Sequence, residues 1–262
     1  MENHTQFKDT PAEFTMIAIQ GGTFDMGSDD KEADNDEKPV HNIILSDYWL
    51  GEYPVTQAVW AYVMQGTDMP DPAHFKGANR PVEQVSWDDI VEQFLPKLNA
   101  ITEGVRPEGT KYYLPTEAQW EYAAIGGKYW NIYPFKYSGS DKLNEVGWYA
   151  ENSYGETKPV GLKTPNLLGL YDMIGNIWEW CEDKREGYKE NYEAVISQYI
   201  KNAFMGAIFN PTGVKEGYYR VPRGGCSFDD AQYCRPTSRD NNTPSYRYYG
   251  IGFRLVLFFP SV

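Results

Sequence analysis

Helical periodicity is clear in the first half of this sequence and fades after it, and this change constrains the fold more than any other feature does. Apolar residues recur at helical spacing in "YPVTQAVWAYVMQ", "VSWDDIVEQFLPKLNAITEG" and "YYLPTEAQWEYAAIGG". Thr56, Ser86 or Asp88, and Thr116 are placed to cap these helices. After about Lys128, short apolar runs, Gly and Asn turns and aromatic residues take over. This pattern predicts an irregular, turn-rich α+β fold, with few helices around small twisted sheets and no regular strand–helix alternation.

The helical segments also predict which side chains face the core. The expected inward residues are Val59, Tyr62 and Val63 in the first helix, Ile90, Phe94 and Leu98 in the second, and Trp120, Tyr122 and Ala123 in the third. Before them, "FTMIAIQGGTFDMGS" alternates apolar and polar residues around Gly21-Gly22, which predicts a hairpin.

The chain contains no linker, low-complexity tract or solenoid repeat, so we expect one domain over residues 14–262 after a flexible N-terminus, 1–13. A helical insertion is expected within residues 183–219, with Tyr192, Ile196 and Tyr199 on one face. The acidic stretch "SDDKEADNDEKP" is expected to be a solvated loop.

Charge and hydropathy limit the partners and the compartment. A net charge of −13 argues against nucleic-acid binding, which needs a basic face. No apolar run reaches the roughly 18 residues of a membrane span, so no membrane insertion is expected. The first residues lack the basic and apolar regions of a signal peptide, which favours a cytoplasmic or phage-associated protein.

Cysteine and histidine are too few to indicate a disulfide framework or a metal centre. Cys181, Cys226 and Cys234 are expected to be free thiols in a reducing compartment, with a Cys226–Cys234 bridge as the alternative. The three histidines (His4, His41 and His74) are scattered, and none has a partner at ligand spacing.

Seven phrases carry a family resemblance. They are "GGTFDMGS", "YPVTQAVW", "RPVEQVSWDD", "YYLPTEAQWEYAAIGG", "KPVGLKTPNLLGLYDMIGNIWEW", "PRGG" and "GFRLV". In this order and spacing, from Phe14 to Leu257, the chain resembles the sulfatase-modifying-factor domain, whose namesake is the formylglycine-generating enzyme. The resemblance implies a C-type-lectin-like fold of the formylglycine-generating-enzyme type. It does not imply an enzyme, because function depends on sites placed on a fold.

Individual residues in these phrases have structural interpretations first. Glu117 suits the start of a helix, where a carboxylate complements the dipole. Trp178 and Trp180 are expected in the core, with Glu179 between them as a buried, paired carboxylate. Because family members bind calcium through Asn and backbone carbonyls near such loops, Asn176 is a candidate calcium ligand. No other cofactor is expected.

The resemblance also allows the catalytic alternative to be examined. The formylglycine-generating enzyme uses two copper-binding cysteines between its "RGG" and "NTP"-like phrases, here Arg223–Gly225 and Asn242–Pro244. Phe228, Asp229 and Asp230 stand where the first cysteine is expected. Cys226 takes a position that is usually serine, and Cys234 lies in a phrase shared with non-catalytic relatives. We therefore expect no enzyme activity, with a copper-dependent oxidase as the minor alternative. A histidine-bound iron centre, found in another branch of the family, has no matching ligand set.

The last segment draws on a narrow set of residues. From Val221 onward there are five arginines but no Lys, Glu, Met or Trp. The segment 221–254 resembles the variable region of proteins diversified by diversity-generating retroelements, in which adenines of AAC codons are randomised. The resulting NNC codons cannot encode Lys, Glu, Met, Trp or Gln, so Gln232 must be a fixed position. The matching framework positions are Arg220, Val221, Arg223–Gly225, Cys234, Arg235, Ser238, Arg239, Pro244, Arg247 and Gly252–Arg254.

The positions between this framework are the candidate ligand-binding residues. They are Ser227, Phe228, Asp229, Asp230, Tyr233, Asp240, Asn241, Ser245, Tyr246, Tyr248 and Tyr249. Tyr, Asp, Asn and Ser are typical of adaptable binding surfaces. Arg235, Arg239, Arg247 and Arg254 are expected to pair with scaffold carboxylates or backbone carbonyls. The sequence thus favours a non-catalytic display protein. Its expected ligand is a protein or glycan on a cell surface. An undiversified binding module is the alternative.

Overall fold

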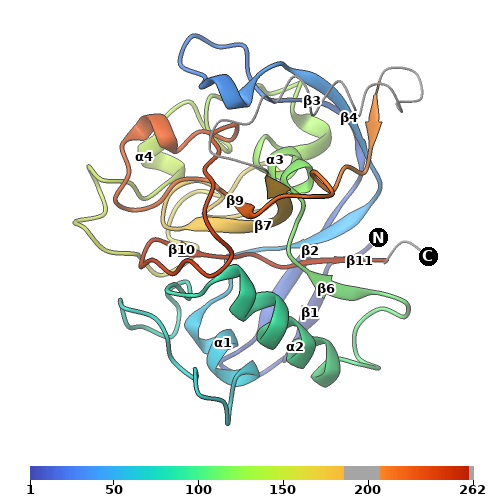
Figure 1. The fold of residues 1–262 in the computed structure, drawn as a ribbon, viewed down its shortest axis with the longest axis vertical. Coiled ribbons are helices and arrows are strands. Elements are labelled where there is room, and N and C mark those ends of the chain that lie inside the picture. Colours follow the sequence, from blue (N-terminus) through green and yellow to red (C-terminus); the bar gives the residue numbers. More distant parts are fainter. Residues whose placement is uncertain (186–206, 260–262) are drawn as a thin grey trace.

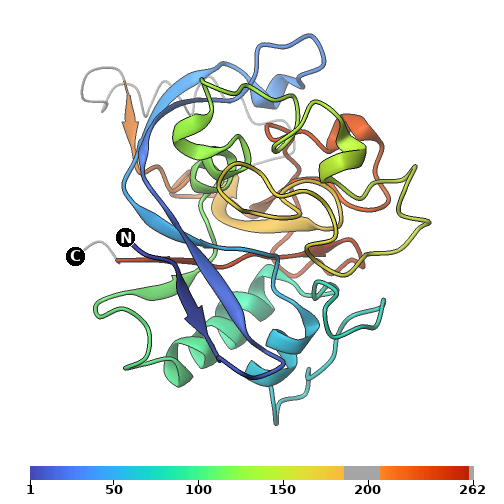
Figure 2. The same cartoon turned by 180° about the vertical axis from the view of Figure 1, so that it is seen from behind.

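The protein is built around a five-stranded sheet that crosses the middle of the molecule (Figures 1 and 2). The computed structural model describes residues 1–185 and 207–259. In spatial order the strands are β1 (His4–Gln6), β2 (Phe14–Ile19), β5 (Tyr48–Gly51), β11 (Val256–Phe258) and β6 (Lys111–Tyr113). All neighbours are antiparallel. Because β11 pairs with a strand on each side, the chain that follows the candidate binding segment 221–254 is anchored in the main sheet.

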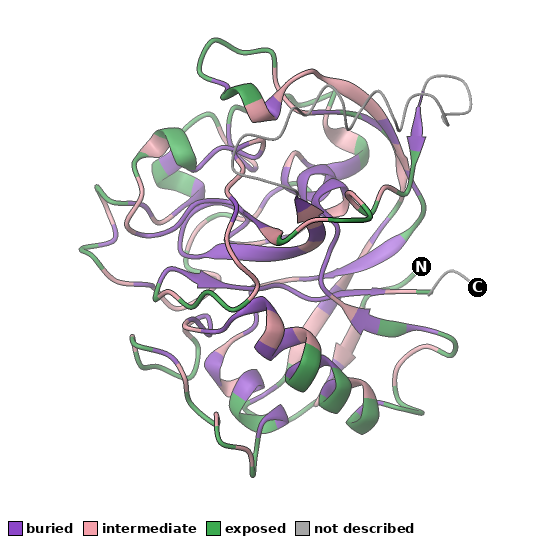
Figure 3. Cartoon of the chain, in the orientation of Figure 1, coloured by how far each residue is buried: buried purple, intermediate pink, exposed green. Residues whose placement is uncertain are grey.

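Two hydrophobic cores cover the two faces of this sheet (Figure 3). Successive strand residues point to opposite faces, so Trp49 enters one core and Leu50 the other. The Trp49 core lies under the helical layer at residues 57–101, where the rings of Trp60 and Phe94 stack with centroids 5.1 Å apart. The Leu50 core includes Trp120, Phe24 and Ile43.

The helices begin where their capping residues predict. They are α1 (Gln57–Val63), α2 (Leu95–Ile101), which follows a π-helical stretch at Asp89–Phe94, α3 (Glu117–Ala124) and the single turn α4 (Leu143–Val146). The Val59 N–H donates to the Thr56 hydroxyl, and Thr116 forms a capping box with Gln119. Ser86 and Asp89 exchange hydrogen bonds before the π-helical stretch. The predicted caps Thr56, Ser86 and Thr116 are confirmed.

The predicted inward faces are also buried, with one exception. The exception is Tyr62, whose side chain is 47% exposed and whose ring contacts Phe7. The inner face of α1 is occupied instead by Val59, Trp60 and Val63. A bulky ring at the edge of a short helix can stay in solvent because the neighbouring Trp60 already fills the core.

Two smaller sheets complete the fold. One has the order β10 (Ile251–Gly252), β7 (Trp178–Arg185), β9 (Tyr219–Arg223), and the other β3 (Gly22–Met26), β4 (His41–Leu45), β8 (Ile208–Phe209). The predicted hairpin at Gly21-Gly22 is wrong, because β2 and β3 belong to different sheets and β3 pairs with β4. A Cβ at Gly21 would lie 2.2 Å from the Leu45 carbonyl oxygen, so the chain passes too close to β4 for any side chain there.

The two ends of the predicted domain also differ from expectation. His4–Gln6 is the edge strand of the main sheet, in place of the flexible N-terminus expected for residues 1–13. The expected insertion 183–219 starts inside β7, which continues to Arg185, and it contains β8. Its predicted helical face, Tyr192, Ile196 and Tyr199, lies outside the described residues. Within residues 1–185 and 207–259, the helices are too short and too polar to cross a bilayer.

Candidate binding surface

Four of the five arginines of the C-terminal segment have buried side chains that pair with carboxylates from other elements. Arg223, at the end of β9, is fully buried; it donates to Glu117 Oε1 at 2.8 Å and also to Glu121. Arg239 forms a two-bond contact with the same Glu117 at 2.8 and 2.5 Å. Burial opposes ionisation of Glu117, but Arg239 and Arg223 outweigh it and lower its pKa to about 2. The helix-start carboxylate is therefore part of a buried charge network.

The acidic loop near the N-terminus belongs to the same framework. Arg235 donates to both oxygens of Glu37, at 2.7 and 2.6 Å, and the Thr237 hydroxyl donates to Glu37 at 2.6 Å. Arg239 also donates to the backbone carbonyl of Asp36. The prediction of a wholly solvated loop is wrong at Glu37, whose side chain is buried. Arg235 supplies the charge that makes this burial possible.

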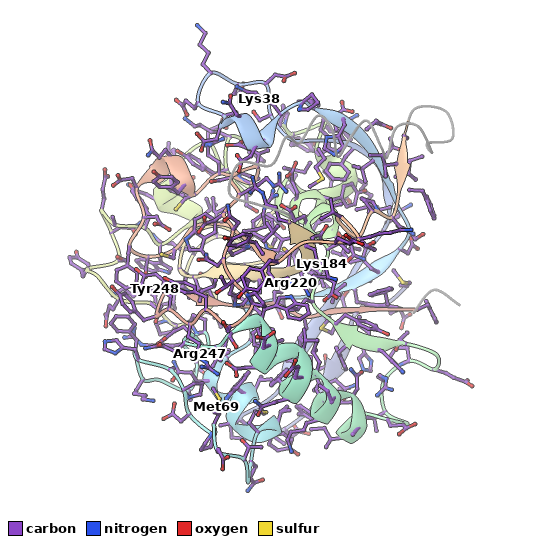
Figure 4. All side chains as sticks on the ribbon, viewed as in Figure 1. Lys38, Met69, Lys184, Arg220, Arg247 and Tyr248 are labelled. Atoms are coloured by element: carbon purple, nitrogen blue, oxygen red, sulfur yellow. The ribbon has the colours of Figure 1, made fainter. Side chains whose placement is uncertain are left out.

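Arg254 and Arg247 are also paired with carboxylates. Arg254 and Glu179 are both buried, with 2.9 Å between Nη2 and Oε1, and the Trp120 indole N–H donates to Glu179 at 2.7 Å. Arg247 donates to both oxygens of Asp89 at 2.7 and 2.6 Å. Arg247 and Tyr248 lie beside the start of the helical stretch that Asp89 opens (Figure 4).

The candidate ligand-binding residues differ in exposure. Asp230, Tyr233, Ser245, Tyr246 and Tyr249 are exposed, and Phe228, Asp229, Asp240 and Tyr248 are half-buried. Ser227 and Asn241 are buried, so they cannot present side chains to a partner in this structure. The Ser227 N–H donates to the Asn176 carbonyl, and the Ser227 carbonyl accepts from the Ser153 hydroxyl. Asn241 is buried beside the bridge that joins Arg220 to Asn242. Residue type alone could not predict the burial of Ser227 and Asn241, because it does not indicate which residue of a turn points inward.

Three of the candidates meet in one group of rings. The ring centroids of Tyr248 and Tyr249 are 4.2 Å apart, and those of Phe228 and Tyr249 are 4.8 Å apart. Tyr246 extends this group with a stacked contact to Tyr248 at 6.3 Å. Asp229 and Asp230 follow Phe228 directly, before the 3₁₀ turn Ala231–Tyr233. Asp240 and Asn241 lie elsewhere on the segment, across from β9.

Two residues outside the C-terminal segment join the group and were not predicted from sequence. Phe75 stacks on Phe228 with centroids 5.8 Å apart, and His74 lies 5.7 Å from the Tyr249 ring. We call His74, Phe75, Phe228, Tyr246, Tyr248 and Tyr249 the aromatic cluster. No spacing or composition signal distinguishes "HF" in the loop after α1, so only the tertiary contact identifies it.

A second loop closes the other side of the surface. The Ser153 hydroxyl donates to the Ser227 carbonyl at 2.6 Å, and the Ala150 N–H donates to that of Asp229 at 3.0 Å. Tyr154 in this loop is 91% exposed. The pair between Arg80 and Glu156, 3.1 Å apart, links this loop to the loop of Phe75. The exposed part of the C-terminal segment therefore lies between two scaffold loops.

The cysteines are free and enclosed. Cys181, Cys226 and Cys234 are all buried and unbridged, so the Cys226–Cys234 disulfide kept as an alternative does not form. Burial raises the pKa of all three thiols, and Asp229 adds to the effect at Cys226 and Cys234. These two residues do not fit a copper-binding catalytic pair, since their sulfurs are shielded from both metal and substrate and their thiolates are disfavoured.

The predicted calcium ligand has its side chain in contact with the backbone. Asn176 adopts a left-handed conformation with φ of 64°, and its amide exchanges hydrogen bonds with the N–H and C=O of Lys158. In the described residues, no group of three or more His, Cys, Asp and Glu side chains is arranged to hold a metal ion. Calcium binding near Asn176 stays a prediction.

The sulfatase-modifying factor enzyme 1-like domain model matches residues 3–258. The chain belongs to this family. Its fold is accordingly the C-type-lectin-like fold of the formylglycine-generating-enzyme type, with few helices and small curled sheets.

The chain is similar to proteins with different names: a variable protein, a formylglycine-generating enzyme and a protein kinase. Treponema denticola variable protein 1 superposes with a TM-score of 0.78 at 29% identity, over 97% of this chain and 98% of that one. The formylglycine-generating enzyme of Thermomonospora curvata is 29% identical over 91% of this chain and 92% of its own length. The serine/threonine-protein kinase Pkn1 of Chlamydia trachomatis is 32% identical over 95% of this chain, which spans 39% of that protein.

Proposed function

We propose that this protein is a non-catalytic ligand-binding protein whose segment 221–254 displays diversified residues on a lectin-like scaffold. One observation carries the proposal. Within this short segment four of the five arginines (Arg223, Arg235, Arg239 and Arg254) have buried side chains in ion pairs with distant elements, while residues between them form an exposed aromatic and acidic surface. A fold anchored in this way tolerates substitution at the exposed positions. Similarity to a variable protein over nearly the full chain supports this proposal.

The ligand class follows from the exposed chemistry. Tyrosine rings give large, rigid contact area at a low entropic cost, and aspartates set a charge preference. A cell-surface protein or glycan fits such a surface. The net charge of −13 and the acidic surroundings disfavour nucleic acid.

The encoding DNA gives the direct test of diversification. We expect a near-copy of the sequence that encodes residues 221–254, beside a reverse transcriptase gene, with differences at adenines. The differences should fall in the codons of exposed residues such as Phe228, Asp230 and Tyr249 and should spare Arg223 and Arg254. The absence of such a copy would reduce the proposal to an undiversified binding module.

The oxidase alternative is favoured by the formylglycine-generating enzymes among the relatives, and thiol chemistry tests it. Because all three thiols are buried with raised pKa values, we expect the native protein at pH 8 to react with a disulfide reagent slowly, and the urea-unfolded protein rapidly. The native protein should bind no stoichiometric Cu(I). Rapid reaction of Cys226 and Cys234 together with tight copper binding would support the oxidase instead.

A further inference from the structure

We propose that the aromatic cluster is a composite surface, part fixed scaffold and part C-terminal segment, which binds an arginine-containing segment of a partner protein. This inference rests on the proposed binding function. It adds His74 and Phe75 to the site and selects one ligand chemistry.

The scaffold part of the cluster is held rigidly. The Phe75 N–H donates to Glu83 Oε1 at 2.7 Å, and the Phe75 carbonyl accepts from Gln57 Nε2 at 2.7 Å. Gln57 Oε1 accepts from the Gly77 N–H at 2.9 Å. Glu83 and Gln57 are both buried, so the loop is tied on each side of Phe75 to the interior. Such preorganisation reduces the entropy lost when a ligand binds.

The contacts across the cluster join this fixed part to the C-terminal segment. The ring centroid of Phe75 lies 6.0 Å from that of Tyr249 and 5.8 Å from that of Phe228. The Gln84 N–H donates to the Tyr248 carbonyl at 3.1 Å. A change at Phe228 or Tyr249 therefore alters one side of the surface and leaves Phe75 in place. His74 and Phe75 would contribute to every ligand that the segment accommodates.

Charge complementarity selects a cationic ligand. The basic residues around the cluster are already paired: Lys76 with Asp71 at 2.8 Å, Arg247 with Asp89 at 2.6 Å, and Arg80 with Glu156. Within the described part of the chain, by contrast, no ion pair engages Asp229 or Asp230, the two residues that follow Phe228. Asp229 Oδ2 accepts from a neutral donor, the Cys226 N–H at 2.8 Å, and Asp230 is exposed. The ring faces carry negative electrostatic potential. Rings beside uncompensated carboxylates suit a guanidinium, which stacks and donates hydrogen bonds at the same time.

The test uses the peptide acetyl-Gly-Arg-Gly-Arg-Gly-amide and its citrulline analogue, which has the same shape without the charge. Binding is measured by NMR titration of the full-length protein at 0.15 M salt, where remote charges are screened. We expect the arginine peptide to bind about fivefold or more tightly than the citrulline peptide. His74→Ala, Phe75→Ala and Asp230→Asn should each weaken binding several-fold, with chemical-shift changes centred on the cluster.

Matched controls separate the site from general charge attraction. Tyr62→Ala removes an exposed ring on α1, and Asp30→Asn removes one exposed charge from the acidic loop. Neither should change binding. The inference is overturned if the citrulline peptide binds equally, if the controls weaken binding as much as the cluster variants do, or if methyl glycosides bind at the cluster while the arginine peptide does not.

The outcome is separable from that of the proposed function. A template copy in the DNA with no arginine-peptide binding would retain the diversified display protein and reject this ligand. Selective peptide binding without a template copy would retain the composite surface and reject diversification.

Discussion

Replacing Arg223 with methionine is expected to lower the free energy of unfolding by about 3–5 kcal/mol, because it leaves a buried carboxylate without its counter-charge. Arg223 is fully buried, and Glu121 is buried with it. Glu117 would keep Arg239, whereas Glu121 would lose this charge partner and keep the hydrogen bond from the Gly27 N–H at 2.7 Å. Methionine fills much of the volume and cannot supply the charge. Urea unfolding followed by tryptophan fluorescence measures the loss.

An exposed ion pair provides the control for Arg223→Met. Lys142 lies 3.2 Å from Glu145 with 77% of its side chain exposed, so Lys142→Met should leave the unfolding curve nearly unchanged. Similar losses in the two variants would show that burial of Arg223 does not determine its contribution. The framework role assigned to this arginine would then be wrong.

Glu83→Gln is expected to stabilise the protein at alkaline pH and not at acidic pH. Burial raises the pKa of Glu83 from 4.5 to about 7, and the hydrogen bonds from Phe75 and His74 offset this only in part. Glu83 Oε2 is buried, and no group within residues 1–185 and 207–259 forms a hydrogen bond with it. Glutamine keeps an oxygen for the Phe75 N–H and removes the buried negative charge, so it resembles the protonated glutamate.

The sign follows from the two pKa values. Between pH 4.5 and about 7 the folded protein keeps a proton that the unfolded chain has released. The stability contributed by protonated Glu83 is therefore complete below pH 4.5 and is lost as pH rises through 7. The difference between the folded and unfolded pKa values of Glu83 corresponds to at most about 3 kcal/mol of unfolding free energy. We expect Glu83→Gln to be more stable than the native protein by up to this amount at pH 8, and the two proteins to be nearly equal in stability at pH 4.5.

Denaturant unfolding at several pH values measures this gain. His74 is present in both proteins, so any contribution from it cancels in the difference. Glu92→Gln, at an exposed position of the neighbouring helical stretch, should show no such pH-dependent gain. A constant difference between Glu83→Gln and the native protein across pH would mean that Glu83 is not a protonated buried acid.

Local sequence determined most of the helices and the framework. Caps at Thr56, Ser86 and Thr116 act within four residues, so their hydrogen bonds can be predicted without knowing the fold. The pairing of Glu179 was also predictable, because a carboxylate between two core tryptophans must find a counter-charge. Its partner, Arg254, was identified only as one of several framework arginines.

The errors came from segments whose structure depends on distant contacts. β2 and β3 have the alternation of a hairpin, yet β3 pairs with β4 and β2 with β5, since the pattern of a strand does not specify its neighbour. Glu37 has the surroundings of a solvated loop, but Arg235, far along the chain, buries it. Ser227 and Asn241 are of the residue types expected on the binding surface, but both are buried.

The sequence by itself determined the family and the α+β class, because these depend on residue identity, local spacing and short-range hydrogen bonds. Tertiary structure alone decided which candidate ligand-binding residues reach solvent. It also decided that His74 and Phe75 complete the surface with Phe228 and Tyr249. The physical reason is that exposure and ring contact depend on how separate loops pack, and sequence encodes this packing only through the whole fold.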